Sequence, residues 1–185
     1  MFDALFTTTT EYKKLSHALS GKGACALFGL PASGRAQVYA ALCRQLDKPL
    51  CIVTPGEAEA TRFAADLNTL GIPAAVFPAR DYVLRPIEGT AREYEYRRLA
   101  VLGELVGGRL RAVAVPAEAL TQFTTPKEDF CANTRTLHPG DTLPRAELTA
   151  LLYGAGYARR DQVDGPGQFS IRGDIVDIYA PDMKQ

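Results

Sequence analysis

The sequence predicts an α/β fold in which a parallel sheet with flanking helices is followed by a small α+β domain with a β-hairpin. Three observations predict it. Short apolar runs alternate with amphipathic segments as far as residue 122, a glycine-rich loop follows the first run, and the pattern changes after Gln122. Strands that alternate with helices in this rhythm are typical of a parallel sheet, because parallel neighbours need a crossover connection between them.

Four short apolar runs predict the strands of the first domain, residues 1–122. Continuous apolar runs are typical of strands that are buried on both faces of a parallel sheet. The runs are residues 24–28, 50–53, 74–77 and 112–115. Apolar residues at helical spacing predict helices over residues 12–19, 38–46, 60–70 and 90–106, the last opened by a capping box at Thr90 and Glu93. Because Cys25 and Cys51 lie inside apolar runs, we expect both to be small core residues.

A different pattern begins in the second domain, residues 123–185. The polar stretch 124–129 predicts a linker, and an extended segment is expected over residues 134–137. Leu148, Leu151 and Leu152 predict one helix. Residues 168–172 alternate in polarity and lead through Gly173 and Asp174 to the apolar run 175–179, which predicts a hairpin.

The composition argues against several classes of function. Lys plus Arg and Asp plus Glu each number 21, so the formal net charge of zero argues against a protein that grips a nucleic-acid backbone through its own surface. No apolar run approaches the roughly 20 residues that cross a membrane, and the N-terminus does not resemble a secretory signal. The four cysteines form no closely spaced pair, and His17 and His138 are isolated. We therefore expect a cytoplasmic, monomeric chain without metal, cofactor or catalytic residue.

A glycine-rich loop lies between the first predicted strand and its helix. Gly29 and Gly34 have P-loop spacing, which lets backbone N–H groups converge on an anion at a helix N-terminus. A working loop continues with Lys, which reaches the phosphates, and with Ser or Thr, which binds magnesium. Here Ser33 and Gly34 are followed by Arg35 and Ala36. Arginine does not replace lysine cleanly and alanine has no oxygen, so we expect no ATP chemistry. A weak phosphate site and a purely structural turn both stay open.

Arginine replaces lysine in most of the second domain. From Cys131 onward there are five arginines, and the one lysine is the penultimate residue. Interfaces favour arginine, because its planar fork makes bidentate contacts. The period of two in a strand puts Ser170 and Arg172 on one face of the hairpin and Phe169 on the other. Arg172 is therefore a candidate for a partner contact, with a solvated surface charge as the alternative.

The segment YARRDQVDGPGQFSIRGDIVDIYAP, residues 157–181, resembles the second domain of the excinuclease B subunit (UvrB) and, equally, the matching domain of the bacterial transcription-repair coupling factor (Mfd). The shared order is a Tyr-x-Arg-x-Asp start, a glycine loop, a Phe-x-x-Arg-Gly-Asp hairpin and an Ile-Tyr-Ala-Pro close. The preceding LHPGDTLPRAELTALLYGAGY is similar to the lead-in helix of the same family. The first domain resembles theirs in element order and in its phosphate loop.

Two departures from UvrB favour the coupling-factor side of this resemblance. UvrB keeps an intact Lys-Thr loop and inserts a tyrosine-rich hairpin after the third strand. This chain has the degenerate loop and runs from Phe77 through Arg80 and Asp81 directly to the Thr90 helix. The resemblance then implies a non-catalytic N-terminal fragment that recruits UvrA in transcription-coupled nucleotide excision repair. The alternative is an ATP-dependent, UvrB-like damage-binding subunit.

The resemblance also implies which residues act and what else the longer protein does. The UvrA contact carries over to Arg159 and Arg172, and the family's other hairpin arginine falls on Ser170. The full-length protein would be an ATP-dependent DNA translocase that contacts RNA polymerase and DNA through domains absent here. The family would continue past Gln185 with another strand, so the second domain is expected to be truncated. An unrelated Rossmann-like enzyme is disfavoured, because its glycine fingerprint and ribose-binding acid are not evident.

Overall fold

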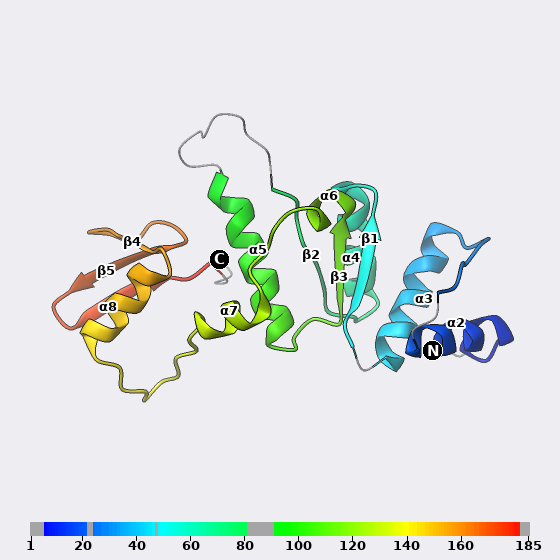
Figure 1. The fold of residues 1–185 in the computed structure, drawn as a ribbon, viewed down its shortest axis with the longest axis horizontal. Coiled ribbons are helices and arrows are strands. Elements are labelled where there is room, and N and C mark those ends of the chain that lie inside the picture. Colours follow the sequence, from blue (N-terminus) through cyan, green and yellow to red (C-terminus); the bar gives the residue numbers. More distant parts are fainter. Residues whose placement is uncertain (1–5, 22–23, 47, 81–90, 182–185) are drawn as a thin grey trace. The chain divides into compact units, whose positions relative to one another are not determined.

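The computed structural model describes residues 6–21, 24–46, 48–80 and 91–181. It confirms the predicted fold class, with helices around a parallel three-stranded sheet and a second, smaller sheet that contains a hairpin (Figure 1). The chain divides into two compact units. Unit 1 is Met1–Arg80 with Gly107–Gln122, and unit 2 is Asp81–Val106 with Phe123–Gln185. None of the helices in the described ranges is long and apolar enough to cross a membrane.

Unit 1 contains a parallel sheet with the strand order β1-β3-β2. Its register pairs both Ile52 and Val76 with Ala114 of the central strand. These strands confirm the predictions at residues 50–53, 74–77 and 112–115. The elements of the unit are α2 (Thr10–Ser20), α3 (Ala32–Gln45), β1 (Leu50–Thr54), α4 (Glu57–Thr69), β2 (Ala74–Val76), β3 (Ala112–Pro116) and α6 (Ala117–Leu120).

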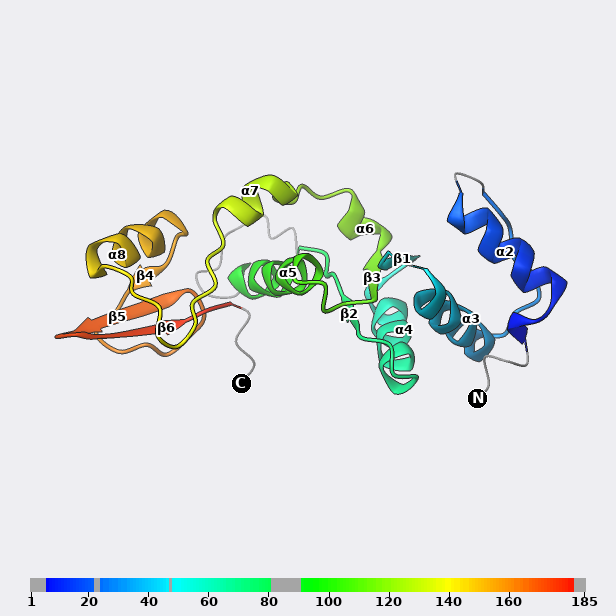
Figure 2. The ribbon, with the colours of Figure 1, turned by 90° about the horizontal axis from the view of Figure 1, so that it is seen from below.

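The core of unit 1 lies between α4 and one face of this sheet. Apolar side chains at helical spacing on α4, among them Phe63 and Leu67, pack against Ile52 and Ala114. A second buried cluster joins α2 to α3 through Tyr12, Leu15, Val38, Ala41 and Leu42. Figure 2 shows α3 between α2 and α4.

Both of the predicted core cysteines are exposed. Cys51 lies on β1, which ends the sheet, and alternate residues of β1 are exposed because one face of the strand is uncovered. Cys25 is also exposed, so both predictions are wrong. The buried cysteine is Cys43 on α3, whose thiol donates to the carbonyl of Arg111 at 3.4 Å. Burial raises the pKa of the Cys43 thiol, although Arg111 and Arg44 lower it in part.

The strand predicted at residues 24–28 does not form. This run is irregular, and Phe28 is 88% exposed. A strand needs a neighbour for its backbone N–H and C=O groups. Among the described residues the sheet ends at β1, and no ladder reaches residues 24–28. Apolar character alone was therefore insufficient, and the prediction is wrong.

Unit 2 contains a three-stranded sheet, which we call sheet B, with the order β4-β5-β6. Strands β5 and β6 form the predicted hairpin, with Arg172 paired to Ile175 across the Gly173–Asp174 turn. The short strand β4 runs parallel to β5 on its other side. The elements of the unit are α5 (Ala91–Val106), α7 (Lys127–Ala132), α8 (Arg145–Gly154), β4 (Ala158–Arg159), β5 (Gln168–Arg172) and β6 (Ile175–Tyr179).

Of three predictions for this part of the chain, the structure changes that of the linker and leaves the other two as predictions. The predicted linker 124–129 runs into α7, which carries Glu128 and Asp129 in its first turn, where carboxylates stabilise a helix. Residues 134–137 are not in a strand. Thr90, the predicted cap of α5, lies outside the described residues.

The core of unit 2 forms where α8 packs on sheet B. Phe169 of β5 is fully buried, and the ring of Tyr153 on α8 meets it edge-on at 5.3 Å between centroids. Helix α5, which falls within the predicted first domain, is part of this unit. Its buried Arg98 donates to the carbonyl of Phe123 at 3.5 Å. Unit 2, which contains sheet B, is therefore built from two separate stretches of the chain.

Candidate functional site

The glycine-rich loop differs from a P-loop in its structural context. Gly29 has a φ of +81°, but no strand precedes it in the described part of the chain. Helix α3 begins at Ala32, so Ser33 and Gly34 already lie in its first turn. The backbone N–H of Arg35 donates to the carbonyl of Pro31 at 3.0 Å, within the helix itself. The strand-loop-helix context that a P-loop requires is therefore absent from the described residues.

Arg35 and Ala36 stand where a P-loop has Lys and then Ser or Thr, and their side chains have other surroundings. The exposed guanidinium of Arg35 lies 3.9 Å from a carboxylate oxygen of Glu59 on α4, and its Nε donates to the carbonyl of Leu30 at 3.5 Å. Ala36 is buried on the inner side of α3. A buried methyl group offers no ligand to magnesium, so the loop lacks both the lysine and the hydroxyl of phosphoryl transfer.

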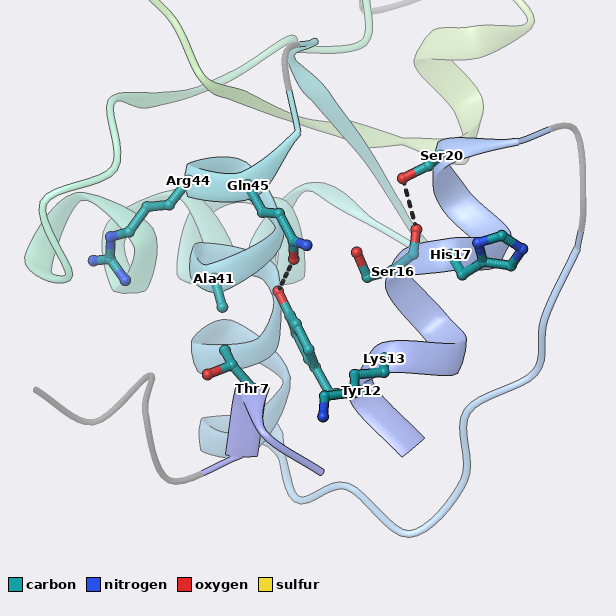
Figure 3. Close-up of a pocket in the computed structure, with 9 residues that line it drawn as sticks. All are labelled: Thr7, Tyr12, Lys13, Ser16, His17, Ser20, Ala41, Arg44 and Gln45. Carbon is teal, nitrogen blue, oxygen red and sulfur yellow. Dashed lines mark hydrogen bonds between the residues drawn. The ribbon is translucent and has the colours of Figure 1, made fainter. Parts of the chain in front are cut away.

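A cavity of about 670 Å³ lies between α2 and α3. The hydroxyl of Tyr12 crosses it and donates to Oε1 of Gln45 at 3.0 Å (Figure 3). Figure 3 shows the side chains of Arg44 and His17 pointing away from the space between the helices. Arg44 instead donates to the carbonyl of Leu70 at 2.6 Å. The side chains of Arg44 and His17 therefore do not converge on the cavity.

An exposed ion pair lies on the face of the hairpin that carries Ser170 and Arg172, which we call its outer face. Nη2 of Arg172 on β5 lies 2.5 Å from Oδ2 of Asp177 on β6. The two residues are diagonal neighbours, because Asp177 pairs with Ser170 and Arg172 pairs with Ile175. Their side chains are 66% and 41% exposed. Arg172 is thus ion-paired and still largely exposed.

Ser170 shares this face but is buried. It is 1% exposed, and its hydroxyl donates to the carbonyl of Asp161 at 3.0 Å. The hydrogen bond holds the start of the segment between β4 and β5 against the sheet. A longer side chain at this position would have to displace Asp161. In this structure the side chain of Ser170 is therefore inaccessible and hydrogen-bonded to the neighbouring segment.

Arg159 lies on the opposite face of sheet B from Arg172. It is exposed at the end of β4, and the parallel register pairs it with Phe169. Paired residues of neighbouring strands point to the same face, and successive residues of one strand point to opposite faces. Arg159 accordingly shares the face of Phe169, and Arg172 that of Ser170. The structure brings the two arginines into one small sheet but not onto one surface.

Comparison with known proteins identifies this part of the chain. Residues 136–185 match the family model described as the UvrB interaction domain. For this resemblance we call the chain the UvrB-like module. It is 30% identical over 155 residues to the transcription-repair-coupling factor of Bacillus subtilis and 35% identical over 159 residues to that of Mycobacterium bovis. It is also 26% identical over 167 residues to the UvrABC system protein B of Chlorobium limicola.

The UvrB-like module is similar to only a part of each relative. The matches cover 83%, 82% and 82% of this chain, but 13% of each of the two coupling factors and 24% of the UvrABC system protein B. The matched residues 136–185 include α8 and all of sheet B. Arg159, Ser170 and Arg172 therefore all lie within the stretch that matches the UvrB interaction domain.

Asp177 is the residue of this site that the sequence did not single out. Its position could have been inferred, because a two-residue turn after Arg172 places Asp177 diagonally across the hairpin. The sequence itself shows only an acidic residue on a predicted strand. The register that the hairpin adopts is what joins the carboxylate to Arg172.

Proposed function

We propose that the UvrB-like module binds UvrA through sheet B and is the non-catalytic recruiting part of a cytoplasmic factor in transcription-coupled nucleotide excision repair. The observation that carries the proposal is the match of residues 136–185 to the UvrB interaction domain, which includes every strand of sheet B. The similarity to two transcription-repair-coupling factors supports the link to transcription. Contacts with RNA polymerase and DNA are assigned to other parts of such a factor.

Arg159 and Arg172 are the proposed contact residues. Both are exposed, and a guanidinium can donate two parallel hydrogen bonds to one carboxylate. They lie on opposite faces of sheet B, but β4 is an edge strand of two residues. A partner that binds around this edge strand can contact both faces of sheet B. Ser170 contributes indirectly, through the hydrogen bond to Asp161 that shapes the edge.

A direct binding measurement tests this function. Purified UvrA should bind the immobilised chain saturably and reversibly in biolayer interferometry. A variant with Arg135→Ala is the matched control, because Arg135 is also an exposed arginine of unit 2 but lies outside sheet B. This control should bind as the parent does. Absence of UvrA binding by a folded parent chain would rule the function out.

The alternative function, an ATP-dependent UvrB-like subunit, rests on the similarity to the UvrABC system protein B. The loop argues against it, because Arg35 reaches toward Glu59 and Ala36 is buried. We predict that ATP with magnesium binds no tighter than millimolar in isothermal titration calorimetry and that phosphate release stays at background. Arg35→Lys with Ala36→Thr should not restore binding, because the described residues before the loop form no buried strand. Micromolar, magnesium-dependent binding by the parent would favour the alternative.

A further inference from the structure

The ion pair on the outer face of the hairpin fixes a side chain that would otherwise be mobile. Arginine has many rotamers, and holding it in one of them costs conformational entropy when a partner binds. Asp177 holds Arg172 at 2.5 Å before any partner arrives. The contact uses Nη2, and the five-donor fork of arginine retains other N–H groups that can donate to a second carboxylate.

Hydrogen bonds also restrain the chain on both sides of Arg172. Ser170, two residues before it, donates to the carbonyl of Asp161 at 3.0 Å. Gly173, the next residue, accepts a hydrogen bond from Nη1 of Arg145 on α8 at 3.2 Å. These two bonds fix the strand and the turn, and neither restrains the guanidinium. Asp177 is the group that fixes its direction.

We propose that Asp177 is a positioning residue, which holds the Arg172 guanidinium ready to donate to a carboxylate of the partner. The inference rests on the proposed function and deepens it, because it names the chemistry of the contact and a second residue on which the contact depends. An exposed ion pair adds little to folding stability. The effect of Asp177 should therefore appear in binding and not in unfolding.

A double-mutant cycle with UvrA tests the proposal. Asp177→Asn keeps the shape of the side chain and removes its charge. We expect it to weaken binding about fivefold, the order of the ordering cost of one long side chain. In an Arg172→Ala background the same substitution should change nothing, because the residue that it positions is gone. Asp177→Glu should recover part of the loss, and thermal melting should be unchanged in all four variants.

Glu147→Gln is the matched control, since Glu147 is another exposed carboxylate of unit 2 that lies near an arginine, 4.0 Å from Arg135. It should leave UvrA binding unchanged. Unchanged or tighter binding by Asp177→Asn would overturn the positioning role, as would an equal loss with and without Arg172. If the parent chain binds and Arg172→Ala does not weaken it, the proposed contact residue is wrong while UvrA binding stands. If the parent does not bind, the proposed function fails as a whole.

Discussion

Alanine in place of Arg172 is expected to lower the affinity for UvrA about thirtyfold. Truncation of an arginine at the centre of an interface costs about 2 kcal/mol or more, and 1.4 kcal/mol corresponds to a tenfold change in affinity. Arg172 is exposed and ion-paired with Asp177, and Arg145 donates a hydrogen bond to the turn that follows it. The measurement is the dissociation constant of UvrA for the parent and the variant, with circular dichroism to verify the fold.

Two comparisons make this result specific. Arg159→Ala should also weaken binding, and the two losses should add in the double variant, because the side chains lie on opposite faces of sheet B. Arg135→Ala should have no effect. Parent-like affinity of a folded Arg172→Ala variant would show that the arginine is an ordinary solvated charge.

The largest loss of stability is expected from Gly167→Ala. Gly167 has a φ of +73°, which strains any residue with a Cβ atom, and an added Cβ would lie 2.9 Å from Cζ of Tyr96 on α5. Its N–H donates to Tyr179 at 2.8 Å and its carbonyl accepts from Ala158 at 2.9 Å, so the backbone cannot move freely. Strain and overpacking together should cost about 2–4 kcal/mol in the free energy of unfolding. Urea denaturation measures this directly.

Gly156→Ala separates the cost of backbone strain from the cost of overpacking. Gly156 has a φ of +82°, but nothing lies within 4 Å of the position that an added Cβ atom would take. It carries the backbone strain without the steric clash, so its substitution should cost only about 1 kcal/mol. Removing the ring with Tyr96→Ala should make Gly167→Ala less costly than it is in the parent. Equal losses for the two glycines would contradict a close packing of Gly167 against α5.

Local patterns were sufficient where one stretch of chain determines its own structure. The hairpin is such a case, because alternation in residues 168–172 and the Gly173–Asp174 turn specify it together. The run at residues 24–28 is the opposite case. Its composition is that of a buried strand, yet pairing depends on a neighbour that is distant in sequence, and the described sheet offers none. For the same reason the edge position of β1 and the exposure of Cys51 were not predictable.

In the candidate site, too, some features follow from the local sequence and others depend on distant parts of the chain. The period of two correctly placed Ser170 and Arg172 on one face of β5, but it could not show that Ser170 is buried under Asp161. Nor could it relate Arg159 to Arg172, because the relative face of two strands depends on their register. The degenerate loop was predictable in its chemistry, since the identities of Arg35 and Ala36 suffice to remove the lysine and the hydroxyl.

The division of each unit into two stretches limits how the chain can be cut. A single cleavage after Gln122 leaves α5 on the product that holds unit 1, while α7, α8 and sheet B stay on the other. A truncated protein that starts at Phe123 lacks Tyr96, the ring beside Gly167, and lacks Arg98, whose guanidinium reaches the carbonyl of Phe123. A continuous stretch that preserves the support of sheet B therefore includes α5 and also β3, which belongs to the other unit.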